Sequence, residues 1–161
     1  MRVIVHRGIP IMSMTRLPTL ASRGRANLHQ GAIGAGVDLA TGRILHAVQD
    51  GAPITLHPDT ARPVLGVVVP SFVRVLEIAV SASDQTGLGY VGADVVVDGK
   101  RGPVLLELNA RPGLAIQAAN RAGLLPRLRA VSERVRPEAP LAERIALGIE
   151  IARAARAVES S

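Results

Sequence analysis

The stretch that decides the fold is GADVVVDGKRGPVLLELNARPG, residues 92–113. Two apolar runs, VVV and VLL, flank the polar sequence DGKRGP, a pattern typical of a β-hairpin. Asp94, Glu107 and Asn109 interrupt strands in which valine or leucine would pack better. Such polar side chains either face solvent or hold a ligand.

The register of this hairpin follows from the position of its turn. A turn centred on residues 100 and 101 pairs residues whose numbers sum to 201, so that Asp94 faces Glu107 and Asn109 faces Gly92. Because side chains alternate between the two faces of a strand, the three polar groups are expected to share one face, with room for a ligand above the glycine. The opposite, apolar face is expected to contain Val95, Val97, Val104, Leu106 and Leu108.

The predicted pairing brings two carboxylates together. Directly opposed residues have Cβ atoms about 5 Å apart, and like charges at that distance destabilise the pair unless a cation lies between them. Oxygen ligands without histidine or cysteine favour Mg²⁺ or Mn²⁺, and magnesium commonly completes its shell with phosphate oxygens. The pattern therefore indicates a nucleotide as well as a metal. The alternative is a solvated outer face, which is our interpretation of Asp98 beside the turn.

Composition limits the class of protein. The 161 residues are 48% hydrophobic but include only two aromatic residues, Phe72 and Tyr90, so a single domain with an aliphatic core is expected. The absence of cysteine excludes disulfides and thiolate metal sites and fits a cytoplasmic location. No apolar run approaches the roughly 18 residues needed to cross a bilayer.

The formal net charge is +6, and Lys100 is the only lysine among 19 basic residues. A basic surplus is compatible with nucleic acid, an acidic lipid surface, a phosphorylated small molecule, or ordinary solvated faces. The scarcity of aromatic residues for base stacking and the scattered arginines argue against nucleic acid.

The remaining segments predict an α+β fold, a mostly antiparallel sheet flanked by helices. Strands are expected on both sides of a turn at Arg7–Gly8, and an extended, glycine-interrupted strand over residues 27–39. A two-residue turn would place Arg2 and Arg16 on opposite faces, whereas a three-residue turn would place them together. Helices are expected after Pro70, around residues 114–123, in the basic segment that follows, and after Pro140.

The hairpin motif, with RVIVHRGIPIMSMTR and NLHQGAIGAGVDL before it, closely resembles the ATP-grasp fold. The α-L-glutamate-ligase-like, sugar-transfer-associated branch of that superfamily is the most similar. The resemblance implies that residues 1–126 form the C-terminal lobe of the fold, without the N-terminal nucleotide-binding lobe. Residues 127–161 are then a basic linker and a C-terminal helix.

The resemblance implies an ATP- and Mg²⁺-dependent carboxylate–amine ligase that works through an acyl phosphate. By position, Asp94 resembles a ligand of one magnesium ion, Glu107 a ligand bridging two ions, and Asn109 a ligand of the second ion. Manganese is an alternative metal. Arg16 resembles the catalytic arginine that stabilises the transferred phosphoryl group, and Arg2 resembles an arginine that contacts phosphate or substrate.

Further site residues rest on the same resemblance. Asn27 and Gly31 fall in a segment that faces the acceptor site in the family. Arg111 either shapes its turn or reaches a phosphate. For the four histidines, His6, His29, His46 and His57, an ordinary buried or exposed imidazole is the favoured interpretation.

The family's phosphate-holding lysines, glycine-rich flap and adenine-binding hinge have no counterpart in these residues. The chain is thus expected to be a fragment, a split-gene product or a remnant, to turn over nothing alone, and to need a separate N-terminal lobe or self-association. The alternative is a non-catalytic module of the same fold that binds an anion or nucleotide.

Overall fold

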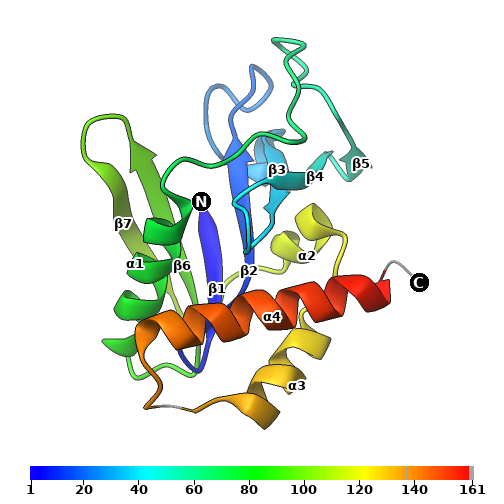
Figure 1. The fold of residues 1–161 in the computed structure, drawn as a ribbon. Helices are drawn as coiled ribbons and strands as arrows, with labels where there is room; N and C mark the ends of the chain where they lie inside the picture. Colours follow the sequence, from blue (N-terminus) through cyan, green and yellow to red (C-terminus); the bar gives the residue numbers. More distant parts are fainter. Residues whose placement is uncertain (137, 160–161) are drawn as a thin grey trace.

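The computed structural model describes residues 1–136 and 138–159, and within them the chain forms one seven-stranded antiparallel sheet with helices on both faces (Figure 1). The strand order is β5-β4-β3-β2-β1-β6-β7. The strands are β1 (Arg2–His6), β2 (Ile9–Leu17), β3 (Ile33–Val37), β4 (Ile44–Gln49), β5 (Ala52–Pro53), β6 (Tyr90–Asp98) and β7 (Gly102–Asn109). The helices are the 3₁₀ turn η1 (Leu28–Gln30), α1 (Phe72–Asp84), α2 (Ala115–Asn120), α3 (Leu125–Arg134) and α4 (Leu141–Glu159). The predicted α+β class is confirmed.

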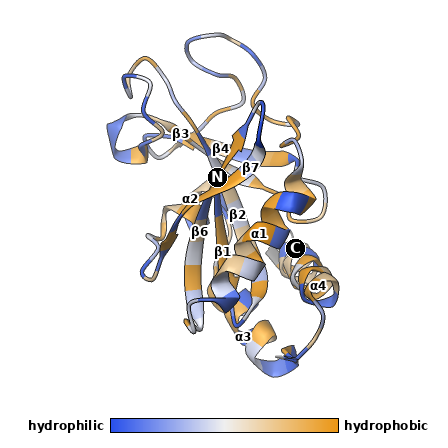
Figure 2. Cartoon of the chain, turned by 90° about the vertical axis from the view of Figure 1, so that its left-hand side faces the viewer, coloured by the Kyte–Doolittle hydropathy of each residue, from blue (hydrophilic) through white to orange (hydrophobic). Residues whose placement is uncertain are grey.

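Each face of the sheet has its own aliphatic core. Helices α1 and α4 cross the face that is nearer the viewer in Figure 1, and bury residues such as Leu76 and Ile145 against Val3. Helix α2 packs on the opposite face, where Ile116 meets Ile4. Hydrophobic residues recur along the strands and α1, and the loops contain both hydrophilic and hydrophobic residues (Figure 2).

The C-terminal helix α4 packs against the part of β2 that has no pairing with β3. Strand β3 pairs only with Ser13–Leu17 of β2, so residues 9–12 extend beyond it. Helix α4 packs against β2 there, and a Cβ at Gly148 would clash with the carbonyl oxygen of Pro10. Burial of Ile151 in the core shows how closely the helix approaches the strand.

The β1–β2 hairpin contains a bulge that sets the direction of its side chains. Arg7 and Gly8 form a two-residue turn with φ values of 49° and 74°. The register then shifts by one residue because Ile11 is inserted into β2. An inserted residue reverses the alternation beyond it, so Arg2 and Arg16 share a face. The expectation that a two-residue turn splits them is wrong because of this bulge.

The β6–β7 hairpin contains a second bulge. Its turn has three residues, 99–101, rather than the predicted two-residue centre. Insertion of Leu106 restores the predicted pairing of Asp94 with Glu107. Leu106 is 66% exposed, and Leu105 packs against the core instead. The prediction that Val104 and Leu106 belong to the apolar face is therefore wrong, since Val104 pairs with Val96 on the opposite face.

The segment at residues 27–39 also differs from its prediction as one long strand. Asn27 caps η1 by accepting a hydrogen bond from the His29 amide at 3.1 Å, and Gly31 ends it with φ 85°. Strand β3 begins only at Ile33. The left-handed glycine, which a continuous strand does not require, forms the turn from η1 into the strand.

Candidate functional site

Four charged side chains meet on one face of the sheet, across β2, β1, β6 and β7. Arg2 pairs with Asp94, which in turn pairs with Glu107 on its other side. Arg16 lies two residues from Met14, the β2 partner of Arg2, and so points to the same face. The structure thus brings together two guanidinium groups and two carboxylates from four neighbouring strands.

Arg2 and Asp94 form a nearly buried, two-pronged ion pair. The Arg2 Nε donates to Asp94 Oδ1 at 2.8 Å, and Nη2 donates to Oδ2 at 2.6 Å. Their side chains are only 8% and 15% exposed. Burial would raise the pKa of Asp94, but the hydrogen bonds and charge of Arg2, together with the charge of Arg16, outweigh it and hold that pKa below its usual value. Asp94 is therefore an ionised carboxylate.

Arg16 has an unsatisfied donor beside these carboxylates. Its Nε is buried without a hydrogen-bond partner. Burial lowers the pKa of Arg16, Arg2 lowers it further, and the charges of Asp94 and Glu107 oppose the shift. A buried, unpaired N–H group is costly, and an anionic oxygen placed here would satisfy it.

Glu107 and Asn109 stand at the open side of the site. Glu107 is exposed, and Asn109 is partly buried opposite Gly92, as predicted. The Asn109 Oδ1 accepts a hydrogen bond from the Arg111 amide at 2.9 Å, which fixes the turn after β7. The Arg111 side chain is exposed, so the backbone of this residue shapes the turn and its guanidinium faces solvent.

The absence of a side chain at Gly92 serves packing rather than a ligand. A Cβ at this position would lie 2.7 Å from Cβ of Pro112, so the glycine makes room for that proline. The expectation of ligand space above Gly92 is wrong for this reason.

Asn27 and Gly31 lie in the loop that joins β2 to β3. Leu28 of this loop covers Gly34, the β3 partner of Arg16. A Cβ at Gly31 would approach the Cβ of Ala21 to 3.1 Å, which accounts for the glycine locally. The loop therefore borders the Arg16 side of the site.

The oxygen atoms of the site supply only part of the coordination shell of a hard cation. Within residues 1–136 and 138–159, no group of three or more histidine, aspartate and glutamate side chains is placed to hold a metal ion. Asp94 and Glu107 supply two carboxylates, and each carboxylate oxygen keeps a second acceptor position when Arg2 is bound. Asn109 and phosphate oxygens would complete a magnesium shell, which matches the small number of protein ligands that magnesium takes. The residues present fit Mg²⁺ held jointly with a phosphate-bearing ligand.

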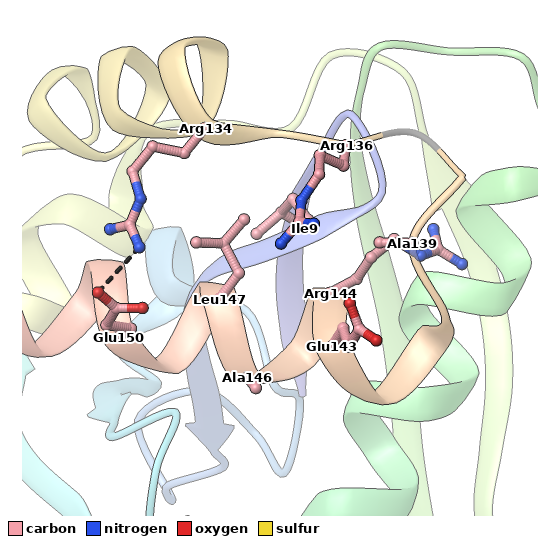
Figure 3. Close-up of a pocket in the computed structure, with 9 residues that line it drawn as sticks. All are labelled: Ile9, Arg134, Arg136, Ala139, Glu143, Arg144, Ala146, Leu147 and Glu150. Carbon is pink, nitrogen blue, oxygen red and sulfur yellow. Dashed lines mark ion pairs between the residues drawn. The ribbon is translucent and has the colours of Figure 1, made fainter.

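Another cavity is lined partly by charged residues. A cavity of about 340 Å³ lies between α4 and the segment that follows α3, where Arg134 and Glu150 pair at 2.8 Å (Figure 3). Arg144 points away from it toward Asp84 on α1, with which it forms two bonds of 2.8 Å. No helix of the described part is long and apolar enough to cross a membrane.

Sequence reasoning missed the partnership of Arg2 with Asp94. These residues are 92 positions apart, and their pairing depends on β1 lying beside β6. Each hairpin was visible in the sequence, but no local signal shows which strands of two hairpins become neighbours.

Comparison with known proteins bears on this geometry. A family model described as sugar-transfer associated ATP-grasp matches residues 1–133, more than half of the chain. No curated protein and no solved structure matches the chain. The match covers every strand of the sheet and every residue of the charged cluster.

Proposed function

Since the chain belongs to the sugar-transfer associated ATP-grasp family, whose fold indicates nucleotide binding and ATP-dependent ligase-type activity, we propose that it contributes the metal- and phosphate-binding face of a carboxylate–amine ligase. In such a reaction a carboxylate oxygen attacks the γ-phosphorus of ATP and ADP leaves. An amine then attacks the acyl carbon, and inorganic phosphate departs with the oxygen that bridged the two groups. Glutamate enters as a substrate only by analogy with the related glutamate ligases.

The observation that supports this proposal is the row of charges on one face of the sheet, in which two guanidinium groups, those of Arg16 and Arg2, are followed by two carboxylates, those of Asp94 and Glu107. Asp94, Glu107 and Asn109 would hold Mg²⁺, which when bound neutralises charge on the ATP phosphates. Arg16 would donate its unpaired Nε–H to a phosphate oxygen. Arg2 would hold Asp94 ionised and oriented, because it already engages both carboxylate oxygens.

The isolated 161 residues would bind Mg–ATP weakly and turn over nothing. Their only lysine, Lys100, lies in the exposed tip of the β6–β7 hairpin, so these residues supply no lysine to hold the phosphates. A second lobe would provide those groups. Detectable ligase turnover by the isolated chain would contradict this part of the proposal.

Calorimetric titration of Mg–ATP into the chain tests the metal site. Glu107→Gln keeps the size of the side chain and removes its charge, and Asp98→Asn makes the same charge change on the same hairpin, outside the cluster. We expect Glu107→Gln to weaken Mg–ATP binding at least about tenfold, the effect of losing one charged contact, and Asp98→Asn to leave it unchanged. Equal affinities of the two variants would refute the assignment.

One observation favours a second function, a non-catalytic module that binds an anion or nucleotide. Arg2 donates a hydrogen bond to each oxygen of Asp94, so the charge of this carboxylate is already balanced by a protein group. ATP binding that persists in EDTA and in Glu107→Gln, but is lost in Arg16→Gln, would support this function over the ligase.

A further inference from the structure

A second polar cavity lies at the opposite end of α2 from the turn after β7. It has a volume of about 170 Å³. No residue of the candidate site lines it. Its lining comes from four regions of the chain, namely β3–β4, the end of α2, α3 and α4: Asp38, Leu45, His46, Asn120, Arg121, Ala122, Arg127 and Arg156.

Positive groups predominate in this lining. Among the described residues that line the cavity, three are arginines, one is a histidine, and Asp38 supplies the carboxylate. Asp38 already accepts from Arg156 Nη2 at 2.8 Å and from Thr41 Oγ1 at 2.7 Å. Burial would raise the pKa of Asp38, but these bonds and the charge of Arg156 outweigh it and hold that pKa below its usual value, so the carboxylate stays ionised.

The arginines are held in place by local structure. Arg127 is only 4% exposed, and its Nη1 donates to the carbonyl oxygen of Gly123 at 2.6 Å. Arg121 ends α2 in the left-handed conformation, with φ 51°. Glycine is the residue that suits such a position without strain. An arginine there costs some stability relative to glycine.

The field in the cavity also acts on His46. Burial lowers the pKa of His46, and the charges of Arg121 and Arg156 lower it further. A bound anion would oppose the effect of the arginines and raise that pKa. The pKa of His46 should therefore report whether an anion occupies the cavity.

We propose that this cavity binds a phosphate group, either free phosphate or the phosphate of a small monoester. Guanidinium groups match phosphate oxygens through paired hydrogen bonds, and three of them converge here from separate elements. The volume is below the roughly 300–1,000 Å³ of pockets for drug-sized ligands, which excludes a whole nucleotide. The site is distinct from the metal-dependent site of the proposed function and needs no divalent ion.

The test is a calorimetric titration of inorganic phosphate, and separately of methyl phosphate, in EDTA and a chloride buffer. Arg121→Gly removes the guanidinium and relieves the backbone, so weaker binding cannot be assigned to unfolding. Arg7→Gly is the matched control, since Arg7 is also exposed, has φ 49° and lies outside the cavity. We expect Arg121→Gly to weaken binding about tenfold or more and Arg7→Gly to change it less than about twofold.

A second readout follows the histidines by NMR, with His46→Gln to identify the signal. Phosphate should raise the pKa of His46 and leave that of His6 unchanged. Tighter binding of methyl phosphate would identify the ligand as a monoester, and tighter binding of inorganic phosphate would identify it as the free ion. No binding of either probe, or equal losses in Arg121→Gly and Arg7→Gly, would overturn the proposal.

Discussion

Replacing Asp94 by asparagine tests whether the charged cluster is held together by its central ion pair. The substitution keeps the shape of the side chain and removes the charge that faces Arg2. Arg2 would then remain 7% exposed, with its guanidinium separated from water and deprived of its ionic partner. The folded state should lose stability, because a buried charge without a partner is costly.

The size of the expected stability loss follows from the burial of the Arg2–Asp94 pair. Removing one partner of a buried ion pair costs about 3–5 kcal/mol. The Asp94 side chain is 15% exposed, and Glu107 faces it from β7, so water and a second carboxylate reduce the cost. We expect a loss of about 3 kcal/mol, which for a domain of this size lowers the melting temperature by about 6–12 °C.

Chemical and thermal denaturation of four proteins measure this effect: the wild type, Asp94→Asn, Arg2→Met and the double variant. Asp98→Asn is the control, because Asp98 lies on the same strand but is fully exposed at the turn. The double variant should lose less stability than the sum of the single variants, by about 2 kcal/mol. Additive losses, or a loss for Asp94→Asn no larger than that for Asp98→Asn, would show that the pair does not stabilise the sheet.

Three further predictions concern register, acid and the C-terminal helix. Deleting the bulge residue Leu106 should keep Mg–ATP binding, because Leu105 pairs with Val95 and Glu107 then follows it directly opposite Asp94. Leu106→Ala should also keep binding, since the side chain is 66% exposed. Calorimetry compares the two variants, and loss of binding in either would contradict this register. The pKa of Asp94 is lowered in the folded state, so the free energy of unfolding should fall as the pH drops below about 4. Denaturation measured at several pH values should show a shallower fall for Asp94→Asn, which lacks this carboxylate. Gly148→Ala should destabilise the protein by about 1–3 kcal/mol, because the new Cβ meets Pro10, and an unchanged midpoint of denaturation would argue against this packing of α4.

Local patterns predicted the hairpins and the pairing of Asp94 with Glu107. Two deviations from the predicted hairpin cancel each other. The turn is one residue longer than expected, and the inserted residue Leu106 restores the register before Asp94 and Glu107. A bulge adds one residue without a composition signal, so alternation alone places Leu106 on the wrong face. The Ile11 bulge changed the outcome for Arg2 and Arg16 in the same way.

Contacts between distant segments were beyond the sequence patterns. The pairing of Arg2 with Asp94 requires β1 to lie between β2 and β6, and the cavity around Arg121 requires α4 to return to the end of α2. Gly92 shows the same limit, because the pattern indicated open space where Pro112 packs. Strand order and helix docking depend on the whole chain, whereas turn and alternation signals are local.

Paramagnetic broadening by Mn²⁺ in the presence of ATP tests the site most directly. Mn²⁺ takes the oxygen ligands that suit Mg²⁺ and broadens NMR signals of nearby residues. The amide signals of Asp94, Glu107 and Asn109 should broaden first, followed by that of Arg2, and the broadening should vanish in Glu107→Gln. Broadening centred on other acidic residues such as Asp84 and Glu143, or no broadening with ATP present, would contradict the assignment of this face as the metal and phosphate site.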